Sequence, residues 1–266
     1  MPGKKSTAVE VLILIPFLLA ATSPENKARA EALIKEARTV YAGRTDADLK
    51  SAMARAEEAG RLCPDCAAPW LLLAEIYWMT GDRLPASAKE RKLGWFQKGE
   101  AAADRAMALD PKGAGPLYWK TTNMASASDL RGWSASLWLF PTLLKNMDEV
   151  DRRDPHYYFG ATDRFWVEVL NRAPLFLADR FGYKPEDVAR DLEEEIRLEP
   201  RFFANYTYAA RLYWKMGEKD KALDRLTYVL THDAGAMPEY KGDNLQHQAL
   251  AKKLWKEWNG KSGPPK

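Results

Sequence analysis

The chain is poor in the residues that carry metal-binding and nucleophilic chemistry. Its 266 residues include only two cysteines and three histidines. A structural zinc site needs four ligands, yet no second cysteine pair and no close histidine pair accompanies Cys63-Pro-Asp-Cys66. His156, His232 and His247 are scattered, and we expect each of them at the surface. Because nucleophile elbows, phosphate loops and metalloprotease motifs are also missing, we expect neither an enzyme nor a cofactor.

The cysteine pair leaves three interpretations open. In an oxidising compartment, Cys63 and Cys66 would close a small disulfide at the mouth of a helical hairpin. In a reducing compartment they would be free thiols, or a redox pair in front of a helix. A thioredoxin-like role requires a βαβ context, which the sequence does not suggest. Haem attachment requires a histidine where Ala67 stands.

The chain also lacks an excess of charge of one sign. Lys and Arg number 40, Asp and Glu number 37, and the formal net charge is +3. Lys4 and Lys5, within the first few residues, supply part of that excess. No basic stripe stands out, so we expect no nucleic-acid partner.

No apolar run is long enough to cross a membrane comfortably. The longest, Val11–Ala21, is shorter than the roughly 20 residues that a span needs, and it contains Pro16. A basic start at Met1–Lys5 and small residues at 20–23 complete the pattern of a secretory signal. We therefore expect residues 1–23 to be a signal peptide or a retained N-terminal membrane anchor, and the protein to be periplasmic or in the cell envelope. The alternative is a frayed hydrophobic helix on a cytosolic protein.

Strand signals are scarce, and helical periodicity with good helix formers dominates the sequence. Four prolines recur along it with spacings of 47, 44 and 45 residues: Pro64, Pro111, Pro155 and Pro200. Proline suits the start of a helix, where its missing N–H leaves no bond unmade. We expect each of the four to follow one helix and to open the next.

Two of these units share a finer pattern at identical offsets from their prolines. The residues are Trp70, Leu73, Ala74, Tyr77, Gly81 and Ala86 in one unit, and Tyr206, Ala209, Ala210, Tyr213, Gly217 and Ala222 in the other. This pattern resembles the tetratricopeptide repeat, which implies an all-α solenoid of antiparallel helical hairpins. The small residues would let paired helices approach. We expect Gly81 and Gly217 to end the first helix of each hairpin in the left-handed conformation.

The remaining units are irregular. We expect an insertion over Arg83–Gly99, a break over Ser126–Ser136 and another break at Arg172-Ala-Pro174. A hairpin of helices over 27–41 and 47–60 precedes the repeats, and a polar helix, Asn244–Trp258, follows as a solvated cap. The repeat domain should therefore span residues 24–258, and residues 259–266 should form a disordered tail.

A closer resemblance covers residues 111–232. Its features are Gly115-Pro-Leu-Tyr-Trp119, Asn123, Met147-Asp-Glu-Val150, Asp154-Pro155, Gly160, Arg172-Ala-Pro174, Leu198-Glu-Pro200, Asn205 and the Gly217–Ala222 hairpin. In order and spacing they resemble the T component of tripartite ATP-independent periplasmic (TRAP) transporters. The resemblance implies an exported helical-repeat protein that holds a ligand and works beside a periplasmic solute-binding protein. Family members are commonly lipoproteins, whereas here no cysteine follows the apolar run.

Aromatic residues are abundant, with ten Trp and eleven Tyr. Adjacent pairs such as Tyr118-Trp119 and Tyr213-Trp214 cannot both face one core, so we expect one member of each in a groove. An aromatic groove with a few polar groups suits an apolar or amphipathic ligand or a partner protein. The candidates are Tyr118, Trp119, Asn123, Trp133, Arg164, Phe165, Arg211 and Trp214. The alternative function is a general protein–protein scaffold of the cell envelope without a small ligand.

Overall fold

Eleven α-helices make up the part of the chain that the structure describes. The computed structural model describes residues 22–172 and 184–260, and no strand occurs within them. The expected all-α fold is confirmed. The helices are α1 Pro24–Tyr41, α2 Asp46–Leu62, α3 Ala67–Asp82, α4 Lys89–Leu109, α5 Ala114–Arg131, α6 Trp133–Arg153, α7 Ala161–Arg172, α9 Pro185–Leu198, α10 Phe203–Met216, α11 Lys219–Thr231 and α12 Lys241–Asn259, with short 3-10 helices η1 Ala234–Ala236 and η2 Pro238–Tyr240.

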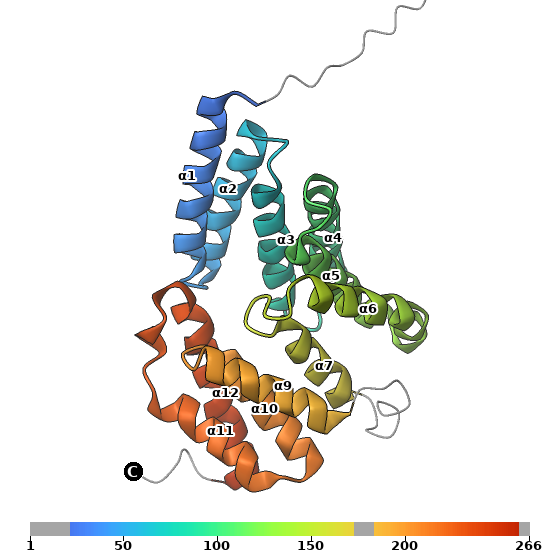
Figure 1. Cartoon of the computed structure of the whole chain (residues 1–266), viewed down its shortest axis with the longest axis vertical. Coiled ribbons are helices and arrows are strands. Elements are labelled where there is room, and N and C mark those ends of the chain that lie inside the picture. The colour runs from blue at the N-terminus through green and yellow to red at the C-terminus, as the bar shows by residue number, and fades with distance from the viewer. Residues whose placement is uncertain (1–21, 173–183, 261–266) are drawn as a thin grey trace, which may run out of the picture.

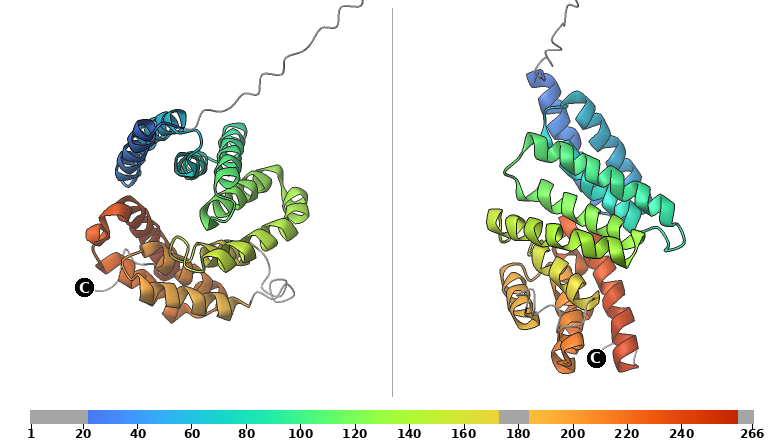
Figure 2. Two further views of the ribbon diagram at one scale, coloured as in Figure 1. Left: turned by 45° about the horizontal axis from the view of Figure 1, so that its top comes forward. Right: turned by 90° about the vertical axis from the view of Figure 1, so that its right-hand side faces the viewer.

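Consecutive helices pair, and the pairs curl into a ring. The first pair shows why the sequence folds in this way: Thr45 and Asp48 form a capping box at the start of α2, and Ala52, Ala56 and Ala59 are 0% exposed against α1. Figure 1 shows α1–α6 above α7–α12. Figure 2 shows the same helices arranged around a centre, and the start of α12 returns to the turn after α1.

The recurring prolines end helices rather than begin them. Cys63, Asp110 and Glu199 are the C-caps of their helices, with φ between −136° and −131° and ψ between 77° and 83°. A residue before proline is excluded from the helical region by the proline ring, which explains these dihedral angles. The next helix starts three residues after the proline in each of these cases. Our prediction that these prolines open the following helix is therefore wrong.

Two glycines permit close packing between helices instead of forming turns. Gly81 lies inside α3, where an added Cβ would be 2.8 Å from Cε1 of Phe96, so it brings α3 against α4 instead of ending α3. At Gly99 an added Cβ would be 2.5 Å from Cγ of Asn123. Helix α4 runs unbroken through this position, and the expected insertion shrinks to the short connection between α3 and α4.

The expected break over Ser126–Ser136 is confined to one residue. Gly132, with φ of +107°, separates α5 from α6, and both helices continue up to it. The predicted left-handed ending at Gly217 is confirmed, with φ of +85°. Helix α7 ends at Arg172, where we expected a break, and the Ala173-Pro174 part of that break lies outside the described residues.

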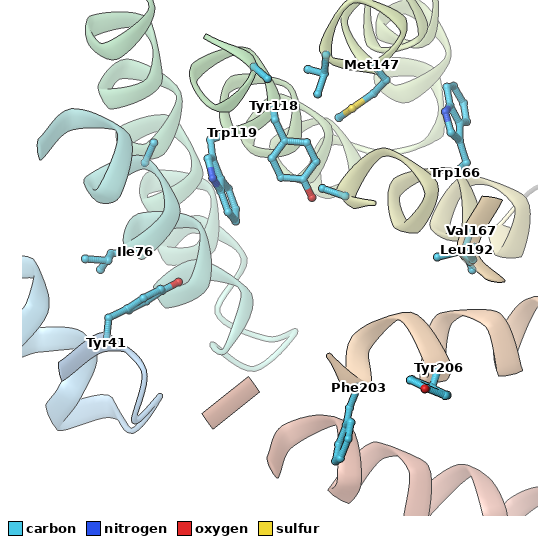
Figure 3. Packing of buried hydrophobic residues seen from close by; sticks show 14 of the residues in the cluster. Tyr41, Ile76, Tyr118, Trp119, Met147, Trp166, Val167, Leu192, Phe203 and Tyr206 are labelled. Carbon is cyan, nitrogen blue, oxygen red and sulfur yellow. The ribbon is translucent and has the colours of Figure 1, made fainter. Parts of the chain in front are cut away.

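The core follows the inner faces of the helices and continues across the ring. Figure 3 shows buried side chains from many helices, including Ile76, Met147 and Leu192. Helix α12 is more than the solvated cap that we expected. Its first turn is buried, and there Asn244 accepts a hydrogen bond from Phe203 N at 2.9 Å. Within the described residues, no helix is long and apolar enough to cross a membrane.

Candidate functional site

A cavity of about 830 Å³, which we call the central chamber, lies inside the ring. Its walls come from α1 and the turn after it, from α3 and α5, from the loop between α6 and α7, and from η2. Six aromatic side chains line it: Tyr41, Trp119, Tyr157, Tyr158, Phe159 and Tyr240. Segments far apart in sequence therefore build one hollow, and its wall combines aromatic rings with charged groups.

The α6–α7 loop brings three of these aromatics inward by means of an unusual backbone. Tyr158, Phe159 and Gly160 have φ of +48°, +54° and +73°, so three successive residues are left-handed. For a residue other than glycine this conformation costs about 1–3 kcal/mol, and such residues concentrate at functional sites. Gly160 cannot be replaced freely, because an added Cβ would lie 2.5 Å from Cγ of Glu195.

Arg164 holds this loop in place. Its guanidinium donates to the carbonyl oxygen of Tyr158 at 2.6 Å, to that of Phe159, and to Oδ1 of Asn205 at 2.6 Å. The Arg164 residue is 6% exposed. We predicted that Arg164 would orient a ligand in the groove. The structure instead commits its donors to the backbone of the aromatic loop, so its contribution to the chamber is indirect.

The ring closes where the turn after α1 meets the start of α12, and we call this contact the seam. Gly242 N donates to Ala42 O at 2.9 Å, and an added Cβ on Gly242 would lie 2.5 Å from Cγ of Arg44. Arg44 is left-handed, with φ of +58°, and is 3% exposed. Its Nε and Nη2 donate to the two carboxylate oxygens of Asp243 at 3.0 and 2.6 Å. The guanidinium also stacks on Tyr41, 3.5 Å from the ring centroid.

Glu75 faces the seam from α3 across the chamber wall. Its carboxylate oxygens lie 3.7 Å from Nη2 of Arg44 and 3.8 Å from Nη1 of Arg38. Burial raises the pKa of Glu75, whereas the two guanidinium groups favour its ionised form. Burial likewise raises the pKa of Tyr240 to about 12. The tyrosine hydroxyls of this wall therefore stay neutral, and its charge comes from arginines, lysine and carboxylates.

Two predicted groove residues lie at the chamber, and both are buried. Trp119 is 4% exposed and lines the chamber, while Tyr118 is 8% exposed and packs behind it, 5.4 Å from Tyr157 between ring centroids. We expected one member of this pair to leave the core. The hollow inside the ring resolves the conflict, because Trp119 reaches the chamber while it still packs on Trp78, at 5.7 Å.

Asn123 is not in a groove, and that prediction is corrected. It is 0% exposed between α3 and α5, where its Nδ2 donates to Trp119 O at 2.8 Å and to Ala74 O at 3.3 Å. Its amide occupies the space that Gly99 leaves by lacking a side chain. Asn123 therefore joins three helices of the N-terminal half.

The other candidates lie away from the chamber. Arg211 pairs with Glu168, Phe165 packs edge-on to Trp166 at 5.4 Å, and Trp214 stacks on Trp258 at 4.4 Å between ring centroids. The Arg211–Glu168 pair joins α7 to α10, the Trp214–Trp258 stack joins α10 to α12, and the Phe165–Trp166 contact lies within α7. The side chain of Trp133 lies outside the described residues.

The main chamber residues that we did not predict are Tyr41, Arg44, Glu75, Tyr158 and Tyr240. One signal was available, namely the run of three aromatics before Gly160, which is too bulky and rigid for an ordinary surface loop. The seam residues carry no such signal, because they become neighbours only when the chain closes on itself.

A disulfide joins Cys63 to Cys66 where α2 meets α3. The nearby Asp65 accepts a hydrogen bond from the Thr22 hydroxyl, so the loop contacts the start of the described chain. Among the described residues, Cys63, Asp65 and Cys66 form the only group with metal-ligand spacing, and the disulfide occupies both sulfur atoms. Of the interpretations left open by the sequence, the structure has the disulfide.

His247 is not the surface residue that we expected. It lies half-buried between α10 and α12, with its Nδ1 2.7 Å from Oγ1 of Thr207. Thr207 donates to Ala204 O, so its oxygen is free to accept a hydrogen bond from Nδ1–H of the neutral imidazole. Burial, assisted by Arg164 and Arg211, lowers the pKa of His247 to about 3.

A second hollow, of about 440 Å³, lies between α6, α7 and α9 and is acidic. Asp151, Asp163, Asp191 and Glu195 all line it. Burial and the carboxylates of Asp191 and Glu195 raise the pKa of Asp163 to about 7. His156 is bound to Glu195, with Nδ1 2.5 Å from Oε1, and this contact raises the pKa of His156.

No family model matches the chain, and no curated protein matches it. Among solved structures, it is similar to a thermophilic tetratricopeptide-repeat protein of Thermus thermophilus, with a TM-score of 0.57 and 15% identity over 83% of this chain and 100% of that one. The chain has a tetratricopeptide-type fold. The MamA protein is also similar, with a TM-score of 0.38 and 14% identity over 86% of this chain and 96% of that one. At such identities the likeness concerns the fold alone, and the TRAP transporter resemblance stays a prediction.

Proposed function

We propose that this protein is an exported, non-enzymatic binding protein that holds an apolar or amphipathic small molecule in the central chamber. We also propose that it acts as an accessory component of TRAP-type solute uptake. The observation that carries the first part is the aromatic cavity of about 830 Å³ inside the closed ring. Small-molecule sites in proteins usually measure about 300–1,000 Å³ and are lined by apolar and aromatic groups with a few placed polar ones.

The strain around the chamber supports a binding role. The non-glycine residues with left-handed backbone in the described chain are Arg44, Tyr158 and Phe159, and all three line the chamber. Packing for stability alone gives no reason to place all of these strained residues around one cavity. A wall that must hold aromatic rings at set positions gives such a reason.

A neutral fluorescent probe tests the proposal. N-phenyl-1-naphthylamine should bind in one-to-one stoichiometry with enhanced fluorescence. Leu71→Trp should abolish binding, because half-buried Leu71 lines the chamber and a larger ring there fills it. Leu71→Met, which conserves volume, is the matched control and should bind as the parent protein does. Binding that is unchanged in Leu71→Trp would place the probe elsewhere and refute the chamber as the site.

Export and transport association rest on other observations. The basic, apolar and small-residue order of residues 1–23 favours export, and the disulfide between Cys63 and Cys66 suits an oxidising compartment. The expected protein partner is a periplasmic solute-binding protein. Cross-linking in intact cells, followed by mass spectrometry, should recover a solute receptor. Recovery from the cytosol alone would refute export.

A second candidate function is a protein–protein scaffold of the cell envelope. The observation that favours it is an apolar patch on α6, where Trp138 is 88% exposed and Leu137 is 52% exposed. Trp138→Glu should then remove a partner from pull-downs of the envelope fraction while leaving probe binding intact. If Leu71→Trp removes that partner and Trp138→Glu does not, the patch is not the docking surface.

A further inference from the structure

We propose that the central chamber admits uncharged molecules and excludes organic anions of the same shape, and that Glu75 is the residue that sets this preference. The inference rests on the proposed ligand-binding function of the chamber. It adds the charge class of the ligand and one specificity-determining residue, and it follows from how the charges in the chamber wall are paired.

The charges at the chamber balance. Lys35, Arg38 and Arg44 contribute three positive charges, and Glu75 and Glu239 contribute two negative charges. The third negative charge is that of Asp243, which binds Arg44 from behind the wall through two hydrogen bonds. His156, which also reaches the wall, is bound to the carboxylate of Glu195. The formal charges of these groups therefore sum to zero, and the described wall presents no net positive charge to an incoming anion.

The pairing around Glu75 is central to this balance. The side chains of Arg44 and Glu75 are 3% and 9% exposed. Arg38, whose side chain is 49% exposed, reaches the Glu75 carboxylate from the solvent-exposed side. Glu75 thus lies 3.7–3.8 Å from two guanidinium groups, one buried and one at the chamber edge. An anion that approaches either guanidinium must compete with a carboxylate that is already in place.

The aromatic wall adds to the penalty for an anion. The faces of aromatic rings are electrostatically negative, so they attract cations and apolar groups and repel anions. A charge removed from water without a partner is also poorly compensated in a buried space. An uncharged molecule meets neither penalty and gains from the ring contacts.

Glu75→Gln reverses this balance with almost no change in shape. Arg38 then loses its carboxylate partner, Arg44 keeps only that of Asp243, and the net charge of this group rises by one. A carboxylate ligand supplies the missing negative charge. The variant should therefore gain affinity for anions and keep its affinity for uncharged molecules.

Two probes of nearly equal shape test this at pH 8: 2-acetylnaphthalene, which is uncharged, and 2-naphthoate, which carries one negative charge. Displacement of N-phenyl-1-naphthylamine reports the binding of each. In the parent protein we expect 2-acetylnaphthalene to bind at least about tenfold more tightly, because tenfold corresponds to about 1.4 kcal/mol and an unpaired charge costs more. Glu75→Gln should cut this ratio at least about tenfold, mainly by tightening 2-naphthoate. Glu36→Gln, at an exposed carboxylate elsewhere on α1, is the matched control and should leave the ratio unchanged.

The outcomes separate the two proposals. Equal or tighter binding of 2-naphthoate to the parent protein overturns the exclusion of anions. An unchanged ratio in folded Glu75→Gln overturns the role of Glu75. If Glu75→Gln does not fold, Arg38→Gln replaces it and should weaken 2-naphthoate further; no weakening counts against the charge balance. If neither naphthalene probe nor N-phenyl-1-naphthylamine binds the parent protein, the proposed ligand-binding function itself fails.

Discussion

The half-buried His247, whose pKa is lowered, makes a quantitative prediction about how stability depends on pH. Its pKa is about 3 in the folded protein and 6.5 when unperturbed. Between these values the unfolded chain binds a proton that the folded chain does not, so stability falls as pH falls through this window. At pH 5 the unfolded imidazole is almost fully protonated and the folded one is not. The resulting loss is about 2 kcal/mol relative to pH 8, from 1.36 kcal/mol per pKa unit over 1.5 units.

The perturbation is His247→Gln, whose amide can still donate to Oγ1 of Thr207 but does not titrate. Other groups titrate in the same range, and Asp163 in particular acts in the opposite direction. The quantity to measure is therefore the difference in the free energy of unfolding between parent and variant, from urea unfolding at pH 8 and at pH 5.

We expect the variant to have a lower free energy of unfolding than the parent at pH 8, because glutamine does not fit the place of the imidazole fully. That margin should shift in favour of the variant by about 2 kcal/mol at pH 5, because the variant escapes the protonation cost. His232→Gln is the matched control, since His232 is exposed, and its margin should shift little. A margin for His247→Gln that is the same at both pH values would refute the half-buried, neutral state of His247.

Three further predictions concern packing and charge. Gly94→Ala should stabilise the protein by about 0.5–1 kcal/mol in urea unfolding, because an added Cβ meets nothing within 4 Å there. Gly99→Ala should destabilise it by about 1–3 kcal/mol, because the added Cβ collides with Asn123. Two effects of the same sign would contradict this packing. Asp163→Asn should stabilise the protein by about 1–3 kcal/mol at pH 8 in the same assay. This gain should shrink at pH 5, because the carboxyl of the parent protein is protonated there. A gain that does not depend on pH would contradict the raised pKa of Asp163. Arg44→Met should cost about 3–5 kcal/mol in unfolding free energy, because it leaves Asp243 buried without its partner, whereas adding Asp243→Leu should restore most of the loss. If the double variant is as unstable as the single one, the cost does not come from the stranded charge.

The local fold was readable from the sequence where short-range chemistry decides it. The left-handed helix end at Gly217 follows from the conformational freedom of glycine, and the two helices of the first hairpin follow from helical periodicity and good helix formers. The errors concern prolines and glycines. The recurring prolines follow helix ends instead of opening the next helix. Gly81, which we expected to end a helix, and Gly99, at the end of the expected insertion, each permit a side chain from another helix to approach, and a local pattern does not show that neighbour.

The candidate site was predicted less well, for the same reason. Abundant aromatics in the middle of the chain indicated a binding surface, and Trp119 does line the chamber. Asn123 and Arg164 were taken for ligand-orienting groups because they are polar residues among aromatics. Their donors instead satisfy backbone carbonyls inside the protein, and a sequence does not show which acceptor a buried donor will meet.

The sequence by itself determined the class of the fold: helical periodicity, small residues at close crossings and prolines after helix ends require an all-α repeat. Only the tertiary structure decided that the repeat closes into a ring. Arg44 and Asp243 are 199 positions apart, and they meet because small rotations between successive hairpins add up along the chain. Those rotations depend on side-chain packing at every interface, which no local pattern records. The chamber, its aromatic wall and its balanced charges all follow from that closure.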